Sequence, residues 1–227
     1  MTLTEFSNEF DSLIRTYSED LKFGKQDIML FNEYEKSVFL TKAQEEIVIE
    51  LYTGRNSTHT AFEETEELRR YLSNLVCTAK LEESDAKPIL PYSYTYKLPD
   101  DIMFITYENL QSNRDLKIVS VYPVSQDEVA KILKNPFRGP SKNRVLRLDL
   151  GKEVELIPPN DSFNMEQYMY LMRYIRKPKP IILVNLPEDV TINNFSTTSE
   201  CELDSSLHRK ILDRAVLLAI QSMYSKK

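Results

Sequence analysis

The chain has 227 residues, of which 41% are hydrophobic and 28% are charged, a composition typical of a folded protein with its own core. Its formal net charge of −6 argues against a protein whose main task is to grip the nucleic-acid backbone, since such proteins are usually basic. With four isolated glycines and two histidines, the sequence has no P-loop, no dinucleotide-binding fingerprint and no histidine-based metal motif.

The cysteines and the apolar runs predict a protein of a reducing compartment that does not enter a membrane. Cys77 and Cys201 are too few for a disulfide framework, so we expect both to be free thiols. No run approaches the roughly 18 consecutive apolar residues that a membrane span needs. The acidic, amphipathic start of the chain is unlike a signal peptide.

Helical patterns dominate residues 1–87. Apolar residues recur at spacings of three and four in three places, which predicts amphipathic helices over residues 3–17, 34–53 and 61–81. Gly54 follows the second helix where a C-terminal cap would fall. Glutamates crowd the start of the third helix, where the helix dipole favours negative charge.

Residues 88–200 are rich in proline, and their patterns predict short strands with one small helix. The alternation from residue 116 predicts a strand, and Ser125 stands three residues before Glu128, the spacing of a capping box for a short helix. Two further strands are predicted on either side of a tight turn near Gly151. Residues 168–186 predict two more strands, completing a mostly antiparallel sheet.

Residues 201–227 predict one last helix, capped by Asp204 or Ser205 and apolar over a broad face. A face this broad should pack against the first three helices. The predicted fold class is therefore α+β: a helical bundle made from the N-terminal helices and the C-terminal helix, with an inserted, mostly antiparallel sheet over residues 88–200.

The segment MYLMRYIRKPKPIILV, residues 169–184, holds four basic residues and two prolines between two apolar runs. Three interpretations fit it: a nucleic-acid grip, a membrane-surface patch, or a strand end that contacts another protein. An acidic chain disfavours the first, and the lack of a surrounding amphipathic helix disfavours the second. Lysine and proline at a strand end also protect a sheet edge from unwanted pairing, so we favour a structural and assembly role.

Acidic pairs at Asp100–Asp101 and Asp127–Glu128 leave an enzymatic alternative open. Paired carboxylates can hold the metal ions of phosphoryl-transfer enzymes, which would make the chain a metal-dependent nucleic-acid-processing or DNA-packaging factor. These pairs fall at a predicted strand entry and a predicted helix start, where acidic side chains are common. We therefore predict no enzyme activity, no cofactor and no metal; a host-side regulatory binding module is a third, weaker alternative.

The order of four phrases carries a family resemblance. EYEKSVFLTKAQEEIVIELY, NPFRGPSKNRVLRLD, RYIRKPKPIIL and LHRKILDRAVLLA follow one another along most of the chain. In this order the chain resembles the head-to-tail adaptor, or tail tubular ring, proteins of tailed bacteriophages, especially those of crAss-like phages that infect gut Bacteroidales.

The resemblance implies a non-enzymatic virion protein assembled in the host cytoplasm. It implies a dodecameric ring in the neck between capsid and tail, in contact with the portal protein and neighbouring ring proteins. DNA would then pass through the ring as transient cargo, which an acidic chain suits because phosphate contacts would slow it. We expect the contacts with other subunits to involve the two proline- and base-rich segments, with these interface candidates: Phe137, Arg138, Arg173, Arg176, Lys177 and Lys179.

Overall fold

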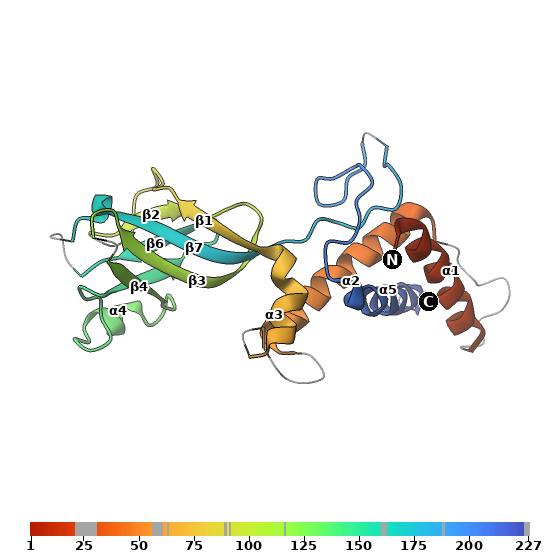
Figure 1. The fold of residues 1–227 in the computed structure, drawn as a ribbon, viewed down its shortest axis with the longest axis horizontal. Coiled ribbons are helices and arrows are strands. Elements are labelled where there is room, and N and C mark those ends of the chain that lie inside the picture. The colour runs from red at the N-terminus through yellow and green to blue at the C-terminus, as the bar shows by residue number, and fades with distance from the viewer. Residues whose placement is uncertain are drawn as a thin grey trace. The chain divides into compact units, whose positions relative to one another are not determined.

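The protein consists of two compact units, described here from a computed structural model (Figure 1). One unit is the continuous segment Val76–Arg176, and the other combines Met1–Leu75 with Lys177–Lys227. We call them the sheet unit and the helical unit. The residues that the structure describes are 1–20, 31–55, 61–62, 64–88, 90, 92–115, 117–159, 163–187 and 189–224.

Three helices pack together in the helical unit (Figure 1): α1 (Leu3–Asp20), α2 (Glu33–Thr53) and α5 (His208–Tyr224). The apolar stripes predicted for them are confirmed, since α1 buries Phe6, Phe10 and Ile14 at a spacing of four. A capping box begins α2, and Gly54, with a φ of 71°, ends it in the left-handed conformation.

The third predicted helix is too long. The structure has α3 (Glu66–Leu72) and a 3₁₀ turn η1 (Ser73–Leu75), after which the chain becomes strand β1 (Val76–Leu81) of the sheet unit. Thr65, rather than an earlier residue, caps α3 by accepting from the Leu68 N–H. The four-helix bundle is not confirmed, because α1, α2 and α5 pack together whereas α3 is a short helix of seven residues.

The sheet unit holds seven strands in the order β1-β7-β3-β4-β5-β6-β2. After β1, the strands are β2 (Tyr94–Lys97), β3 (Ile102–Ser112), β4 (Ile118–Pro123), β5 (Arg144–Asp149), β6 (Glu153–Ile157) and β7 (Tyr168–Arg176). All described pairs are antiparallel except β4 with β5, which are parallel and joined by α4 (Val129–Leu133). The prediction of a mostly antiparallel sheet is confirmed.

The sheet curls until its two edge strands meet. The chain just after β1 bonds to β2: the Ser84 N–H donates to the Thr95 carbonyl (2.7 Å), and the Lys97 N–H donates to the Glu82 carbonyl (3.3 Å). These bonds pair the edge strand β2 with the chain after β1, so the curled sheet leaves fewer groups open to promiscuous pairing.

Two local predictions in this unit have different outcomes. The tight turn is confirmed, since β5 and β6 pair as a hairpin and Gly151 has a φ of 91°. The short helix is also present as α4, but its capping box is wrong: Glu128 is the N-cap, and no side chain caps the helix. The Ser125 carbonyl instead accepts from the Glu128 N–H in a turn before α4.

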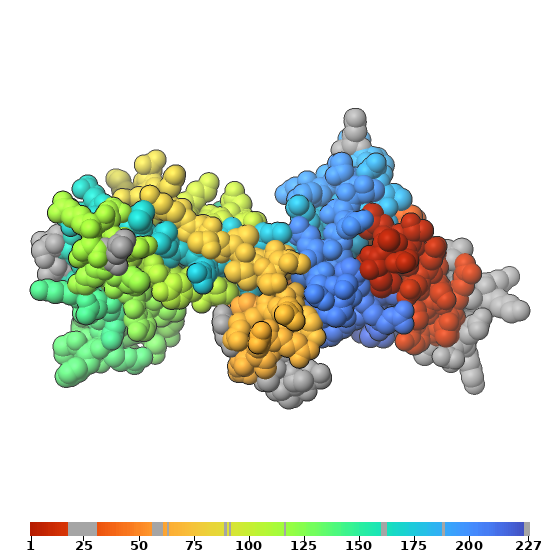
Figure 2. Space-filling view, in the orientation of Figure 1, coloured from red at the N-terminus to blue at the C-terminus, as the bar shows by residue number. Residues whose placement is uncertain are grey.

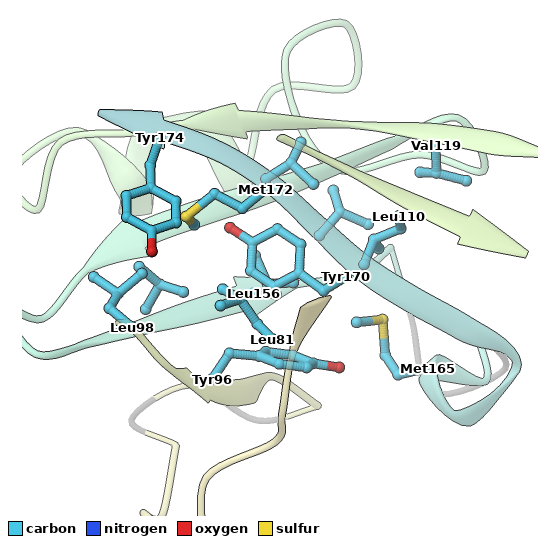
Figure 3. Close-up of a cluster of buried hydrophobic side chains, with 13 residues drawn as sticks. Leu81, Tyr96, Leu98, Leu110, Val119, Leu156, Met165, Tyr170, Met172 and Tyr174 are labelled. Carbon is cyan, nitrogen blue, oxygen red and sulfur yellow. The ribbon is translucent and has the colours of Figure 1, made fainter. Parts of the chain in front are cut away.

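The core of the sheet unit surrounds Tyr170 (Figure 3). Its ring meets that of Tyr96 edge to face at 5.2 Å. The Tyr170 hydroxyl donates to Glu108 at 2.5 Å, and Arg147 approaches the other oxygen of this carboxylate at 3.0 Å. The Glu108 side chain is 7% exposed and the Arg147 side chain 10%, so each charge depends on the other for its main stabilisation.

Helix α5 offers a matched test of its apolar face. Leu212 is fully buried, whereas Leu217, on the same helix, is 49% exposed. We predict that Leu212→Ala lowers the free energy of unfolding of the helical unit by about 2–5 kcal/mol. The control Leu217→Ala should change it by less than about 0.5 kcal/mol. Urea denaturation followed by helical circular dichroism measures both, and equal losses would contradict the packing of α5.

Glu108 supplies a pH-dependent test. Burial raises the pKa of its carboxyl, against the opposing effects of Arg147 and Tyr170. A raised pKa in the folded state means that the contribution of this group to stability is present below its unfolded pKa and is lost as the pH rises through the folded value.

We therefore predict that the wild-type protein loses stability relative to Glu108→Gln as the pH rises from 4 towards 7. Thermal unfolding of the two proteins across this range measures the difference. A difference that is constant, or that grows in favour of the wild type, would contradict the raised pKa.

Candidate assembly surfaces

The segment after β7 is an extended chain that lies on α2. The sequence predicts a second strand here, but the described residues between 177 and 203 form only isolated bridges, such as Ile182 with Ser199. Polar side chains of α2 hold it instead. Gln44 donates to the Lys179 carbonyl (2.8 Å), and the Ile181 N–H donates to Thr41 (3.1 Å).

The polar contacts of α2 follow one face of the helix. Ser37, Thr41 and Gln44 stand at positions i, i+4 and i+7, and all three are buried. The Leu183 N–H donates to the Ser37 hydroxyl at 3.0 Å. A buried backbone N–H without a partner costs about 1–3 kcal/mol, so this polar stripe makes burial of the segment possible. Sequence analysis missed the stripe, although three hydrogen-bonding residues on an otherwise apolar face were its signal.

The RKPKP motif is therefore built into the fold. Pro178 and Pro180 are buried, whereas the side chains of Lys177 and Lys179 are exposed. The Lys179 N–H donates to one oxygen of Glu202 (2.9 Å), and its ammonium lies 3.5 Å from the other. Lys179 thus has a partner within its own unit.

The six interface candidates fall into three groups. Arg173, exposed, and Arg176, half-buried, belong to β7, whereas Lys177 and Lys179 begin the segment on α2. Phe137 and Arg138 lie together in the connection between α4 and β5.

The α4–β5 connection, residues 134–143, projects from the sheet unit (Figures 1 and 2). Asn135 fixes its shape, because its side-chain oxygen accepts from the N–H groups of Phe137 (2.9 Å) and Arg138 (3.2 Å). Gly139 packs so closely that an added Cβ would lie 2.9 Å from the Asn135 carbonyl oxygen. Arg144 donates to the Phe137 carbonyl (2.8 Å) and lies over the ring of Tyr122 on β4.

This rigid connection presents an apolar side chain to solvent. Phe137 is 87% exposed, the highest value of any large hydrophobic residue in the part of the chain that the structure describes. A large exposed aromatic on a fixed backbone is typical of an anchor for a protein partner.

Charge is divided unevenly between the two units. The sheet unit has fourteen acidic and fourteen basic residues, so the helical unit carries the entire net charge of −6. Within the sheet unit, residues 129–144 contain five basic residues and no acidic one: Lys131, Lys134, Arg138, Lys142 and Arg144. None of these five forms a salt bridge with any residue that the structure describes.

The carboxylates of the enzymatic alternative do not assemble into a site. Asp101 accepts a hydrogen bond from the Tyr174 hydroxyl (3.1 Å), while Asp127 and Glu128 lie exposed at the start of α4. Among the described residues, no group of three or more His, Cys, Asp or Glu side chains is placed to hold a metal ion. Nor is any described helix long and apolar enough to cross a bilayer.

Comparison with known proteins decides the family. The family model for phage tail ring protein 3/4 matches residues 1–227. The chain belongs to the phage tail ring protein 3/4 family. It is 46% identical to Ring protein 3 of Bacteroides phage crAss001, over 98% of this chain and 96% of that protein. It is 34% identical to Ring protein 4/5 of the same phage, over 96% of this chain and 92% of that protein.

Membership in this family confirms the resemblance to structural ring proteins of crAss-like phages. Family members are named as ring proteins of the phage tail, which indicates a structural role. In this ring-protein fold, the segment on α2 and the α4–β5 connection are the two places where basic and proline-rich sequence has a defined structure.

The segment on α2 gives a matched substitution. Thr41→Val keeps the volume of the buried side chain but removes the acceptor of the Ile181 N–H, so we predict a loss of about 1–3 kcal/mol in stability. The control is Thr53→Val, at an exposed position near the end of the same helix. Hydrogen exchange should be faster at Ile181 in the first variant only. Unchanged exchange there would contradict the role of the polar stripe.

Proposed function

We propose that this protein forms one ring of the neck between the capsid and the tail of a crAss-like phage, as the counterpart of Ring protein 3. The observation that carries the proposal is the match along the whole chain: the identity to Ring protein 3 covers 98% of this chain and exceeds the identity to Ring protein 4/5. The ring would be a dodecamer in contact with neighbouring ring proteins and, at the head side, with the portal protein.

The ring forms part of the conduit through which DNA leaves the capsid. A conduit should not hold DNA, because each phosphate contact with Lys or Arg adds to a sequence-independent affinity. The net charge of −6 supports this role, since the acidic excess repels the DNA backbone. Assembly takes place in the host cytoplasm, and the protein has no catalytic role there.

The six interface candidates keep their proposed role in assembly, but they differ in how well they are placed to contact another subunit. Phe137, Arg138 and Arg173 are exposed and lie on the sheet unit, so they are the residues best placed to meet a neighbouring subunit. Arg176 and Lys177 mark the junction of the two units. Lys179, being paired with Glu202, contributes by fixing its segment.

The proposal predicts where the protein is found. Quantitative mass spectrometry of purified virions should detect the chain at the stoichiometry of a dodecamer, and gold-labelled antibodies against it should mark the neck. Antibodies against the major capsid protein serve as the control for labelling. Absence of the chain from purified virions, or labelling spread over the capsid, would contradict the proposed function.

A further inference from the structure

A closed ring requires two different surfaces on each subunit, one that fits the other on the next copy. The first is available in the sheet unit, and we call it the basic loop, residues 131–144. It carries five basic residues with no salt bridge to the residues that the structure describes, and it holds Phe137 at 87% exposure.

The second surface lies in the helical unit between α3 and the 3₁₀ turn η3 (Ser205–Leu207). It is a hollow of about 590 Å³, and we call it the acidic hollow. Three carboxylates and one guanidinium line it together with a phenol and a hydroxyl: Glu66, Glu67, Asp204, Arg70, Tyr71 and Ser206. Its lining therefore has an excess of negative charge, opposite to that of the basic loop.

The three carboxylates of the acidic hollow are only partly balanced within the subunit, by the guanidinium of Arg70. Glu67 accepts from the Tyr71 hydroxyl, and Asp204 accepts from the Ser206 N–H (2.9 Å) and hydroxyl (2.6 Å). Neither of these, nor Glu66, forms a salt bridge with another described residue. Elsewhere in this unit, the acidic residues of α2 pair with basic residues of α5, as Glu50 does with Lys210 (3.3 Å).

We propose that the basic loop of one copy docks in the acidic hollow of the next copy, with Phe137 as the apolar anchor beside Tyr71. Arg138 pairs there with Glu66 and Glu67. The proposal rests on the proposed function, because it assumes that copies of this chain meet in a ring. It adds the two surfaces that meet and the chemistry that selects them.

Three features favour this specific contact over a non-specific association of the two surfaces. The loop is fixed before binding by Asn135, Gly139 and Arg144, which lowers the entropy lost on docking. An exposed phenylalanine flanked by arginine has the composition of an interface hot spot. Opposite charges then set the register and speed the encounter, and only a head-to-tail contact uses both surfaces of every subunit.

Charge reversal tests the pairing with a built-in control. Arg138→Glu and Glu66→Arg each place like charges opposite one another and should reduce self-association of the purified protein at least about tenfold. The double variant restores opposite charges and should recover most of the association. Glu66 forms no hydrogen bond or salt bridge with another residue that the structure describes, and Arg138 is held only through its backbone N–H. All variants should therefore stay folded, with a melting temperature close to that of the wild type.

Cysteine cross-linking tests the geometry independently. Copies carrying Arg138→Cys and copies carrying Ser206→Cys should form disulfide-linked oligomers when mixed. Copies with Arg138→Cys mixed with Leu217→Cys, at an exposed site of α5 away from the hollow, should not. The native Cys77 and Cys201 are half-buried. The wild-type protein, treated in the same way, measures any cross-linking that they cause.

The outcomes distinguish a failure of the docking contact from a failure of the proposed neck role. No rescue by the double variant, or equal cross-linking at Leu217, overturns the docking even if the chain is found in neck rings of virions. Copies that dock in this way but are absent from virions overturn the neck role instead. If Arg138→Glu leaves self-association intact and removes salt-dependent binding to duplex DNA, the basic loop contacts nucleic acid, and the docking is wrong.

Discussion

The hydrogen bonds between α2 and the segment after β7 are the interaction on which the helical unit depends. The chain leaves this unit after Leu75, forms the whole sheet, and must return at Lys177 to reach α5. Residues 180–183 of the returning segment are buried but have no strand beside them, so their backbone groups need other partners. Thr41 and Gln44 supply them across about 140 residues of sequence, and α5 can then close over α1 and α2.

The same interaction explains where sequence reasoning succeeded and failed. Periodicity located α1, α2, α5 and the hairpin at Gly151, because each buries one regular face or needs one special turn conformation. It missed β1, since the apolar residues that follow α3 fit a helical spacing as well as an alternating one. The pattern also predicts a strand over residues 181–186, because an apolar run does not reveal that the hydrogen-bond partners of its backbone are side chains of a helix.

The candidate site shows a similar limit. Base- and proline-rich composition found Phe137 and Arg138, and Phe137 is the most exposed large hydrophobic residue of the described chain. Composition also selected Lys179, whose partner Glu202 stands 23 residues later and is brought near only by the fold. It overlooked the acidic hollow, because α3 and η3 are distant in sequence and their carboxylates stand at helix starts, where acidic residues are common.

The central claim is that this chain closes a ring in the neck of the virion through contacts between its own copies. The most direct measurement is a cryo-electron microscopy reconstruction of the neck of the phage particle. The account predicts a closed ring into which the helical and sheet units fit, with the α4–β5 connection of each copy in density continuous with the next copy. A neck with no ring that accommodates this fold would contradict the account.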